Sequence, residues 1–119
     1  MLVKEFYDTV GGNYNKAIET LMNDDFIKRM LMKFSQSEIL NDLIKAYQNN
    51  YMKGIFAATH TLKGVAGNLS LTPLYEKASI VCEMTRNVKE GEIIRTDKEM
   101  EELIKLYQLI IYNVKTLLS

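Results

Sequence analysis

The residue best suited to chemistry is the only histidine, His60, in the segment YMKGIFAATHTLKGVAGNL, residues 51–69. A neutral imidazole is a nucleophile near physiological pH, and it can carry a transferred group covalently. Lys63 follows three positions later, and Gly64 and Gly67 follow four and seven positions later. At about 100° per residue, all three share one face of a helix with His60. The spacing predicts an imidazole with a cation at hand and few neighbouring side chains.

The opposite face of the same predicted helix is apolar, so His60 is expected to be exposed. The predicted core stripe consists of Tyr51, Ile55, Ala58, Leu62, Val65, Ala66 and Leu69. Each glycine inside a helix costs about 1 kcal/mol relative to alanine, and such conflicts with propensity occur where function needs them. We expect Gly64 and Gly67 to leave space for the backbone of another molecule. Their phase disfavours the alternative, close packing against a neighbouring helix.

The chemistry around His60 is that of a carrier. Lys63 lies one turn away, where its ammonium can reach a phosphoryl group on the imidazole as a compact point charge. No carboxylate lies within one turn of His60, and the sequence holds neither a metal-ligand cluster nor a Gly-rich phosphate loop. These features favour a nucleophile whose partner supplies the remaining groups, and they disfavour an autonomous enzyme. The alternative is an ordinary pair of solvated surface side chains.

The chain has only one proline and six glycines, the residues that most often end helices, so we expect long helices in an all-α fold. Short helices are expected over residues 2–10 and 14–22. A third element begins after Asn23 as N-cap, continues to about residue 49, and kinks or breaks near 35–37. Further helices are expected over 51–69, 72–88 and 96–118. Thr72 is the expected cap of the second of these, followed by Pro73, and Thr96 and Glu99 form an expected capping box before the last.

Four substantial helices joined by short connections predict an up-down four-helix bundle over residues 23–118. Residues 1–22 would be a helical lead-in that covers one end, and all 119 residues would form a single domain. Ile80 and Met84 lie off the core stripe of the 72–88 helix. They are interpreted either as part of a contact surface or, slightly favoured, as a cover for the short N-terminal helices.

Composition narrows the possible partners and surroundings. Fifteen basic residues balance fifteen acidic ones, so no global charge favours nucleic acid or a membrane surface. A single cysteine excludes an internal disulfide framework. The first residues lack the apolar core of a signal peptide, and no apolar run approaches the roughly 20 residues that span a bilayer. We expect a soluble cytoplasmic monomer without a metal or cofactor of its own.

The segment HTLKGVAGNL, residues 60–69, resembles the signature of histidine-containing phosphotransfer (HPt) domains, often H-x-x-K-G-x-x-x-x-[LIV]-G. The resemblance extends over about residues 11–118, through GGNYNKAIETLMNDDFIKRMLMKF, NNYMKGIFAATHTLKG and LTPLYEKASIVCEMTRNVKEGE. It implies that His60 takes a phosphoryl group from a receiver-domain aspartate and passes it to another receiver. Lys63 would stabilise the phosphoryl group, and Gly64 would allow close docking. Implied partners are response-regulator receivers, which carry the divalent cation, and a hybrid sensor histidine kinase.

The sequence departs from the family pattern at two positions. Ser70 stands where a glycine is common, and Cys82 stands where a Gln or Glu often holds the imidazole or the phosphoryl group. One face of the predicted 72–88 helix, expected to flank His60, carries the remaining candidates: Tyr75, Ser79, Cys82 and Arg86. Arg86 matches a basic position of the family and could meet the acidic rim of a receiver. A solvated arginine is the plain alternative.

Two other classes of protein compete with a phosphocarrier. One is a non-catalytic helical interaction module, including a degenerate HPt-like domain that docks receivers without transfer. The other is the dimerisation domain of a histidine kinase. Such domains usually carry an acidic residue directly after the histidine, whereas Thr61 stands there in this chain. The kinase alternative would also predict a dimer.

Overall fold

The computed structural model describes all 119 residues, which form seven α-helices and no strand. In chain order they are α1 (Val3–Val10), α2 (Tyr14–Leu21), α3 (Asp24–Ser35), α4 (Ile39–Gln48), α5 (Met52–Asn68), α6 (Thr72–Thr85) and α7 (Asp97–Leu118). The all-α prediction is confirmed, and the expected break of the third element separates α3 from α4. No helix is both long and apolar enough to cross a membrane.

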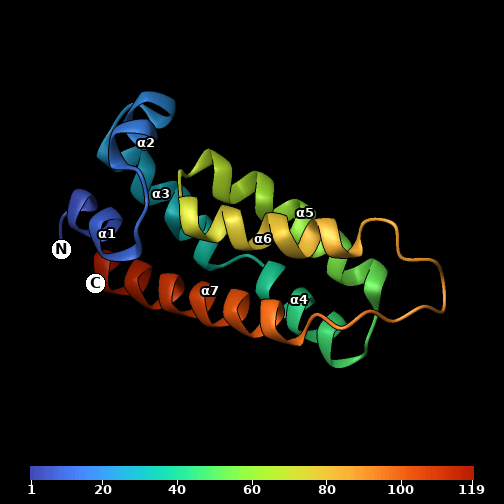
Figure 1. Cartoon of the computed structure of the whole chain (residues 1–119). Helices are drawn as coiled ribbons and strands as arrows, with labels where there is room; N and C mark the ends of the chain where they lie inside the picture. Colours follow the sequence, from blue (N-terminus) through green and yellow to red (C-terminus); the bar gives the residue numbers. More distant parts are fainter.

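The helices form an up-down bundle in which α3 and α4, one after the other, make up one of four members. Figure 1 shows α5 and α6 side by side, with α7 along the other edge of the bundle. In addition, α4 packs on α5, and α3 packs on α7. The two short helices α1 and α2 lie at the end where α7 finishes. The predicted bundle with a helical lead-in at one end is therefore confirmed.

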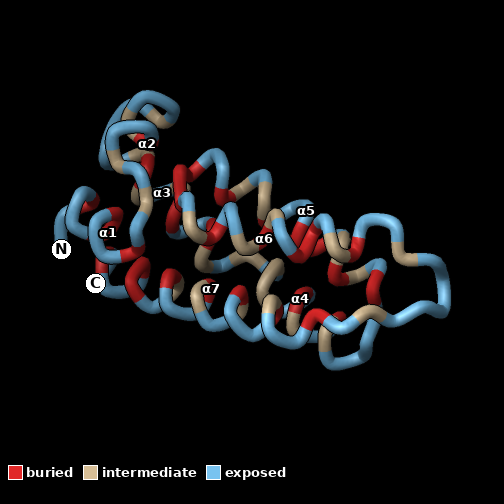
Figure 2. The backbone as a smooth tube through the Cα atoms, in the orientation of Figure 1, coloured by how far each residue is buried: buried red, intermediate tan, exposed pale blue.

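Each helix turns an apolar stripe inward, and Figure 2 shows the buried residues along the facing sides of the helices. Near the middle of the core, the rings of Phe34 and Tyr107 are stacked 5.1 Å apart. At the end covered by α1, Tyr7 is fully buried and its hydroxyl donates a 2.7 Å hydrogen bond to the carbonyl of Leu69. This bond attaches the lead-in to the last turn of α5, the helix that carries His60.

The N-terminal caps of three helices agree only in part with the predicted ones. Asn23 caps α3 as expected, because its side chain accepts a 2.9 Å hydrogen bond from the amide of Phe26. The cap assigned to Thr72 is wrong, since this residue is the first of α6 and follows Leu71 at the N-cap position. Thr96 precedes α7, but its side chain makes no capping bond. It is buried, with φ −123° and ψ 10°, which is not the extended geometry of a capping threonine.

Tyr51 corrects the predicted core stripe of α5. The structure leaves its side chain 56% exposed, because α5 begins at Met52 and Tyr51 precedes it with an extended backbone. Helical phase therefore does not apply to Tyr51, and Met52 is buried instead. Val65 is half-buried and packs against the core, as its position in the stripe predicts.

Helix α6 also differs from expectation, because it ends at Thr85 and leaves Ile80 exposed. The favoured interpretation of Ile80, as a cover for the N-terminal helices, is wrong. Those helices meet α6 at its beginning, where a Cβ built on Gly11 would lie 3.1 Å from the ring of Pro73. Ile80 lies about two turns further along.

Candidate functional site

His60 lies in the middle of α5 with its side chain exposed, opposite the buried residues Ile55 and Leu62. Helical periodicity alone predicted this orientation. Gly64, one turn later, is also exposed, and a Cβ built on it would meet no atom within 4 Å. The surface beside the imidazole is therefore open to the approach of another molecule.

Five of the candidate residues come together in one shallow depression of about 330 Å³. Its lining consists of these five and Asn68: His60, Lys63, Gly64, Gly67, Asn68 and Tyr75. Gly67 is less open than Gly64, because a Cβ on it would lie 3.5 Å from the ring of Tyr75 on α6. The expectation of empty space holds for Gly64 and only in part for Gly67.

Lys63 reaches across the depression towards α6. Its ammonium lies 5.9 Å from the centre of the Tyr75 ring, within the range of a cation–π contact. The ion pairs of this protein involve Lys53, Lys77 and Arg86. The charge of Lys63 is therefore not neutralised by a carboxylate and stays available to an anionic group at His60.

The imidazole of His60 also stacks on Phe56, with ring centroids 5.7 Å apart and ring planes at 18°. The guanidinium of Arg86 lies 5.3 Å from the centre of the same Phe56 ring. Arg86 is held in turn by Glu83 on α6, through Nε and Nη2 at 2.8 Å from one carboxylate oxygen. A phenylalanine thus joins the predicted nucleophile to the predicted basic residue.

The other two candidates on α6 are placed differently from expectation. Cys82 is completely buried, so it cannot line the exposed surface beside His60. Its sulfur lies 3.9 Å from Nη2 of Arg86, a long and weak contact. Ser79 is half-buried, and its hydroxyl donates a 2.7 Å hydrogen bond to the carbonyl of Tyr75. Neither side chain presents a free polar group to a partner.

Sequence reasoning missed Phe56 and Asn68. The signal for Phe56 was present, because a residue four positions before His60 lies on the same helical face. Asn68 lies at the end of α5, and its place in the depression depends on where Tyr75 of α6 lies. Only the packing of two helices reveals that proximity.

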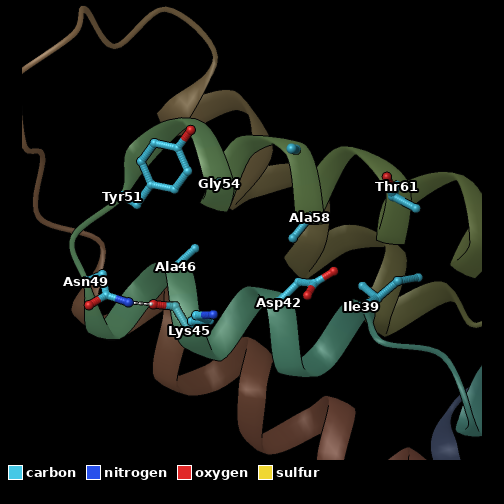
Figure 3. A pocket seen from close by; sticks show the side chains of 10 residues that line it. Ile39, Asp42, Lys45, Ala46, Asn49, Tyr51, Gly54, Ala58 and Thr61 are labelled. Atoms are coloured by element: carbon cyan, nitrogen blue, oxygen red, sulfur yellow. Dashed lines mark hydrogen bonds between the residues drawn. The ribbon is translucent and has the colours of Figure 1, made fainter.

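A larger hollow of about 540 Å³ lies between α4 and α5 (Figure 3). Its walls are mostly small or aliphatic, with Asp42 and Lys45 at the α4 side. The two helices approach closely at Gly54, where an added Cβ would lie 2.9 Å from the Cβ of Ala46. The hollow contains no nucleophile comparable to His60, and nowhere do three His, Cys, Asp or Glu side chains gather as a metal site requires.

Comparison with known proteins identifies one family. A family model described as the Hpt domain matches residues 30–111, more than half of the chain. The match includes all of α4, α5 and α6 and therefore His60, whereas α1 and α2 lie outside it. No curated protein and no solved structure matches the chain significantly.

Proposed function

This chain belongs to the Hpt domain family, and we propose that His60 carries a phosphoryl group between receiver domains of a multistep phosphorelay. Hpt domains are phosphotransfer modules of two-component signalling, and they are phosphocarriers rather than catalysts. The observation that carries the proposal is the exposed imidazole in mid-helix, with the unpaired Lys63 on one side and open space over Gly64.

The first transfer requires a nucleophile and charge stabilisation. The unprotonated ring nitrogen of His60 attacks the phosphorus of an aspartyl phosphate on the donor receiver, in line with the leaving carboxylate. The new N–P bond forms as the bond from phosphorus to the carboxylate oxygen breaks, through a loose transition state. Lys63 leaves Tyr75 and shares the phosphoryl charge with the divalent cation of the receiver. In the second transfer, a carboxylate oxygen of another receiver aspartate attacks the phosphorus, and the new P–O bond forms as the N–P bond breaks and releases the imidazole of His60.

Docking relies on short-range contacts, because the formal net charge of the chain is zero and provides no long-range steering. The partner backbone would approach over Gly64. A hybrid sensor histidine kinase is the proposed source of the phosphoryl group, and response-regulator receivers are the proposed donor and acceptor domains. We propose the cytoplasm as the compartment where these partners meet.

The direct test is His60→Gln, mixed with isolated receiver domains that have been phosphorylated with acetyl phosphate. The wild-type protein is expected to gain a label that acid removes and alkali preserves, as for phosphohistidine. The variant is expected to gain none, while its helical circular dichroism stays unchanged because His60 is exposed. Equal labelling of the variant would exclude His60 as the acceptor.

Lys63 is tested by reversing its charge. Lys63→Glu places a carboxylate beside the phosphoryl group, so we expect transfer to slow by about 10-fold or more without unfolding. Lys115→Glu is the control, because Lys115 is an exposed lysine on α7. Equal transfer rates for wild type and Lys63→Glu would show that Lys63 has no part in transfer.

The second candidate function is receiver docking without transfer. The observation in its favour is the buried Cys82, which does not reach the exposed surface beside His60, at a position where the resemblance leads one to expect a Gln or Glu. The labelling experiment separates the two functions. Receiver binding with acid-labile label supports the phosphocarrier, whereas receiver binding without label supports the docking module.

A further inference from the structure

Three side chains from two helices form a column next to the depression: His60, Phe56 and Arg86. Phe56 precedes His60 by one turn of α5, and its ring is 5.7 Å from the imidazole with the two planes nearly parallel. Arg86, at the end of α6, has its guanidinium carbon 5.3 Å from the centre of the Phe56 ring. Both distances fall in the range of attractive aromatic and cation–π contacts.

The far end of the column is anchored. Both Nε and Nη2 of Arg86 lie 2.8 Å from one oxygen of Glu83, and Nη2 is also 3.9 Å from the sulfur of Cys82. A guanidinium held at two atoms has few orientations left. The Phe56 ring therefore contacts a group whose position α6 defines.

No side-chain hydrogen bond holds the imidazole of His60 in one orientation. His60 takes part in none of the side-chain hydrogen bonds, and those of Thr59, Ser79 and Arg86 end on backbone carbonyls, on Glu83 or on the Cys82 sulfur. An exposed histidine without contacts would sample several rotamers, and misplacement of a nucleophile slows reaction strongly. The contact that the structure gives to the imidazole ring is its stacking on Phe56.

We infer that Phe56 is a positioning residue for His60, and that Arg86 acts through Phe56 by holding its ring. The inference rests on the proposed function, because orientation matters only if His60 accepts the phosphoryl group. Stacking suits a carrier, because contact with the ring face leaves both nitrogens of the imidazole unoccupied. A hydrogen bond would occupy one of them.

The test uses Phe56→Leu in the full chain, since leucine keeps a large apolar side chain but removes the aromatic face. At saturating concentrations of a receiver domain phosphorylated with acetyl phosphate, we expect the single-turnover rate to fall about 3- to 10-fold. The receiver concentration at half-saturation should not change, because positioning affects the reaction step. Phe56→Tyr, which keeps the ring, should retain the wild-type rate.

A matched control exists elsewhere in the chain. On α3 the half-buried Phe26 has the guanidinium of Arg29 5.3 Å from its ring centre, the same contact as in the column. Phe26→Leu should leave transfer unchanged. Nuclear magnetic resonance supplies a readout that needs no receiver: Phe56→Leu should shift the ring-proton signals of His60 by removing the ring current, and Phe26→Leu should not.

The part played by Arg86 is tested in two backgrounds. Arg86→Gln should slow transfer in the wild-type chain and have no further effect in Phe56→Leu, because both changes remove one interaction. Equal losses in both backgrounds would instead mean that Arg86 touches the receiver, which overturns its assigned role.

Failure of the inference and failure of the proposed function differ in outcome. If wild type is labelled on His60 and Phe56→Leu reacts at the same saturated rate with unmoved His60 signals, the positioning role is overturned and the phosphocarrier stands. If wild type acquires no label from any receiver while Phe56→Leu still shifts the His60 signals, the stacking is real but the proposed function falls, and the positioning role falls with it.

Discussion

The three glycines of α5 stand in different surroundings and should therefore respond differently to the same change, Gly→Ala. At Gly64 an added Cβ meets nothing within 4 Å, and at Gly67 it makes an ordinary contact with Tyr75 at 3.5 Å. At Gly54 it lies 2.6 Å from the ring of Tyr51 and 2.9 Å from the Cβ of Ala46. Because all three glycines lie in the same helix, differences in stability between the three Gly→Ala variants report what surrounds each glycine.

For Gly64→Ala only the intrinsic helix term applies. Alanine is preferred to glycine inside a helix by about 1 kcal/mol, so the free energy of unfolding should rise by roughly that amount. In a chain of 119 residues, this corresponds to a rise of about 4 °C in the melting temperature. Gly67→Ala should give a similar or slightly smaller gain.

For Gly54→Ala the same helix term is outweighed by overpacking. The exposed Tyr51 ring can swing away, but the Cβ of Ala46 cannot move without displacing α4. Overpacking of this kind costs about 1–3 kcal/mol, which leaves a net loss of about 1 kcal/mol after the helix gain is subtracted.

Urea unfolding followed by circular dichroism at 222 nm measures all three changes, with the denaturant slope as a check on two-state behaviour. We expect Gly64→Ala to be more stable than wild type and Gly54→Ala less stable. A destabilised Gly64→Ala would refute the reasoning, because it would mean that the space over Gly64 is occupied.

Phosphoryl transfer by the same variants tests why a glycine stands at position 64. If a receiver docks over this residue, Gly64→Ala should be the more stable protein and the slower phosphocarrier. Unchanged transfer by this variant would show that close approach over Gly64 is not required.

Three further predictions concern the ends of the bundle. Tyr7→Phe removes the buried hydrogen bond to the carbonyl of Leu69, so the free energy of unfolding, measured with urea, should fall by about 1–2 kcal/mol. A fall below about 0.5 kcal/mol would show that this bond does little to attach α1 to the bundle. Ser70 has a positive φ of 54° and a buried hydroxyl without a partner. Ser70→Gly should therefore raise the free energy of unfolding by about 1 kcal/mol and the melting temperature by several degrees. An unchanged melting temperature would show that the backbone is not strained at Ser70. The hydrogen bond that the Tyr47 hydroxyl donates to Asp97 raises the pKa of Tyr47 from 10.0 to about 12. The stability that this bond contributes is therefore complete below pH 10 and is lost as the pH rises towards 12. The stability difference between wild type and Tyr47→Phe, measured from pH 9 to 12, should shrink over that window, and a constant difference would show that this bond does not cause it.

Local periodicity was enough to predict most of the helices and the exposed face around His60. The spacing of apolar residues along α5 places His60 opposite Leu62 and puts Lys63 and Gly64 beside it, because a helix repeats every 3.6 residues in any surroundings. The misplaced caps and the exposed Tyr51 belong to helix ends. There the backbone leaves the helical repeat, so periodicity no longer predicts direction.

Tertiary structure decided which groups of α6 and α4 meet α5. Cys82 is buried instead of flanking His60, Arg86 contacts Phe56, and Gly67 faces Tyr75. Likewise, Gly54 allows close packing of α4, whereas Gly64 faces open space. These differences depend on the rotation of each helix about its axis and on the distance between axes. Those quantities follow from side-chain packing across the whole core, so the spacing of residues within one helix could not reveal them.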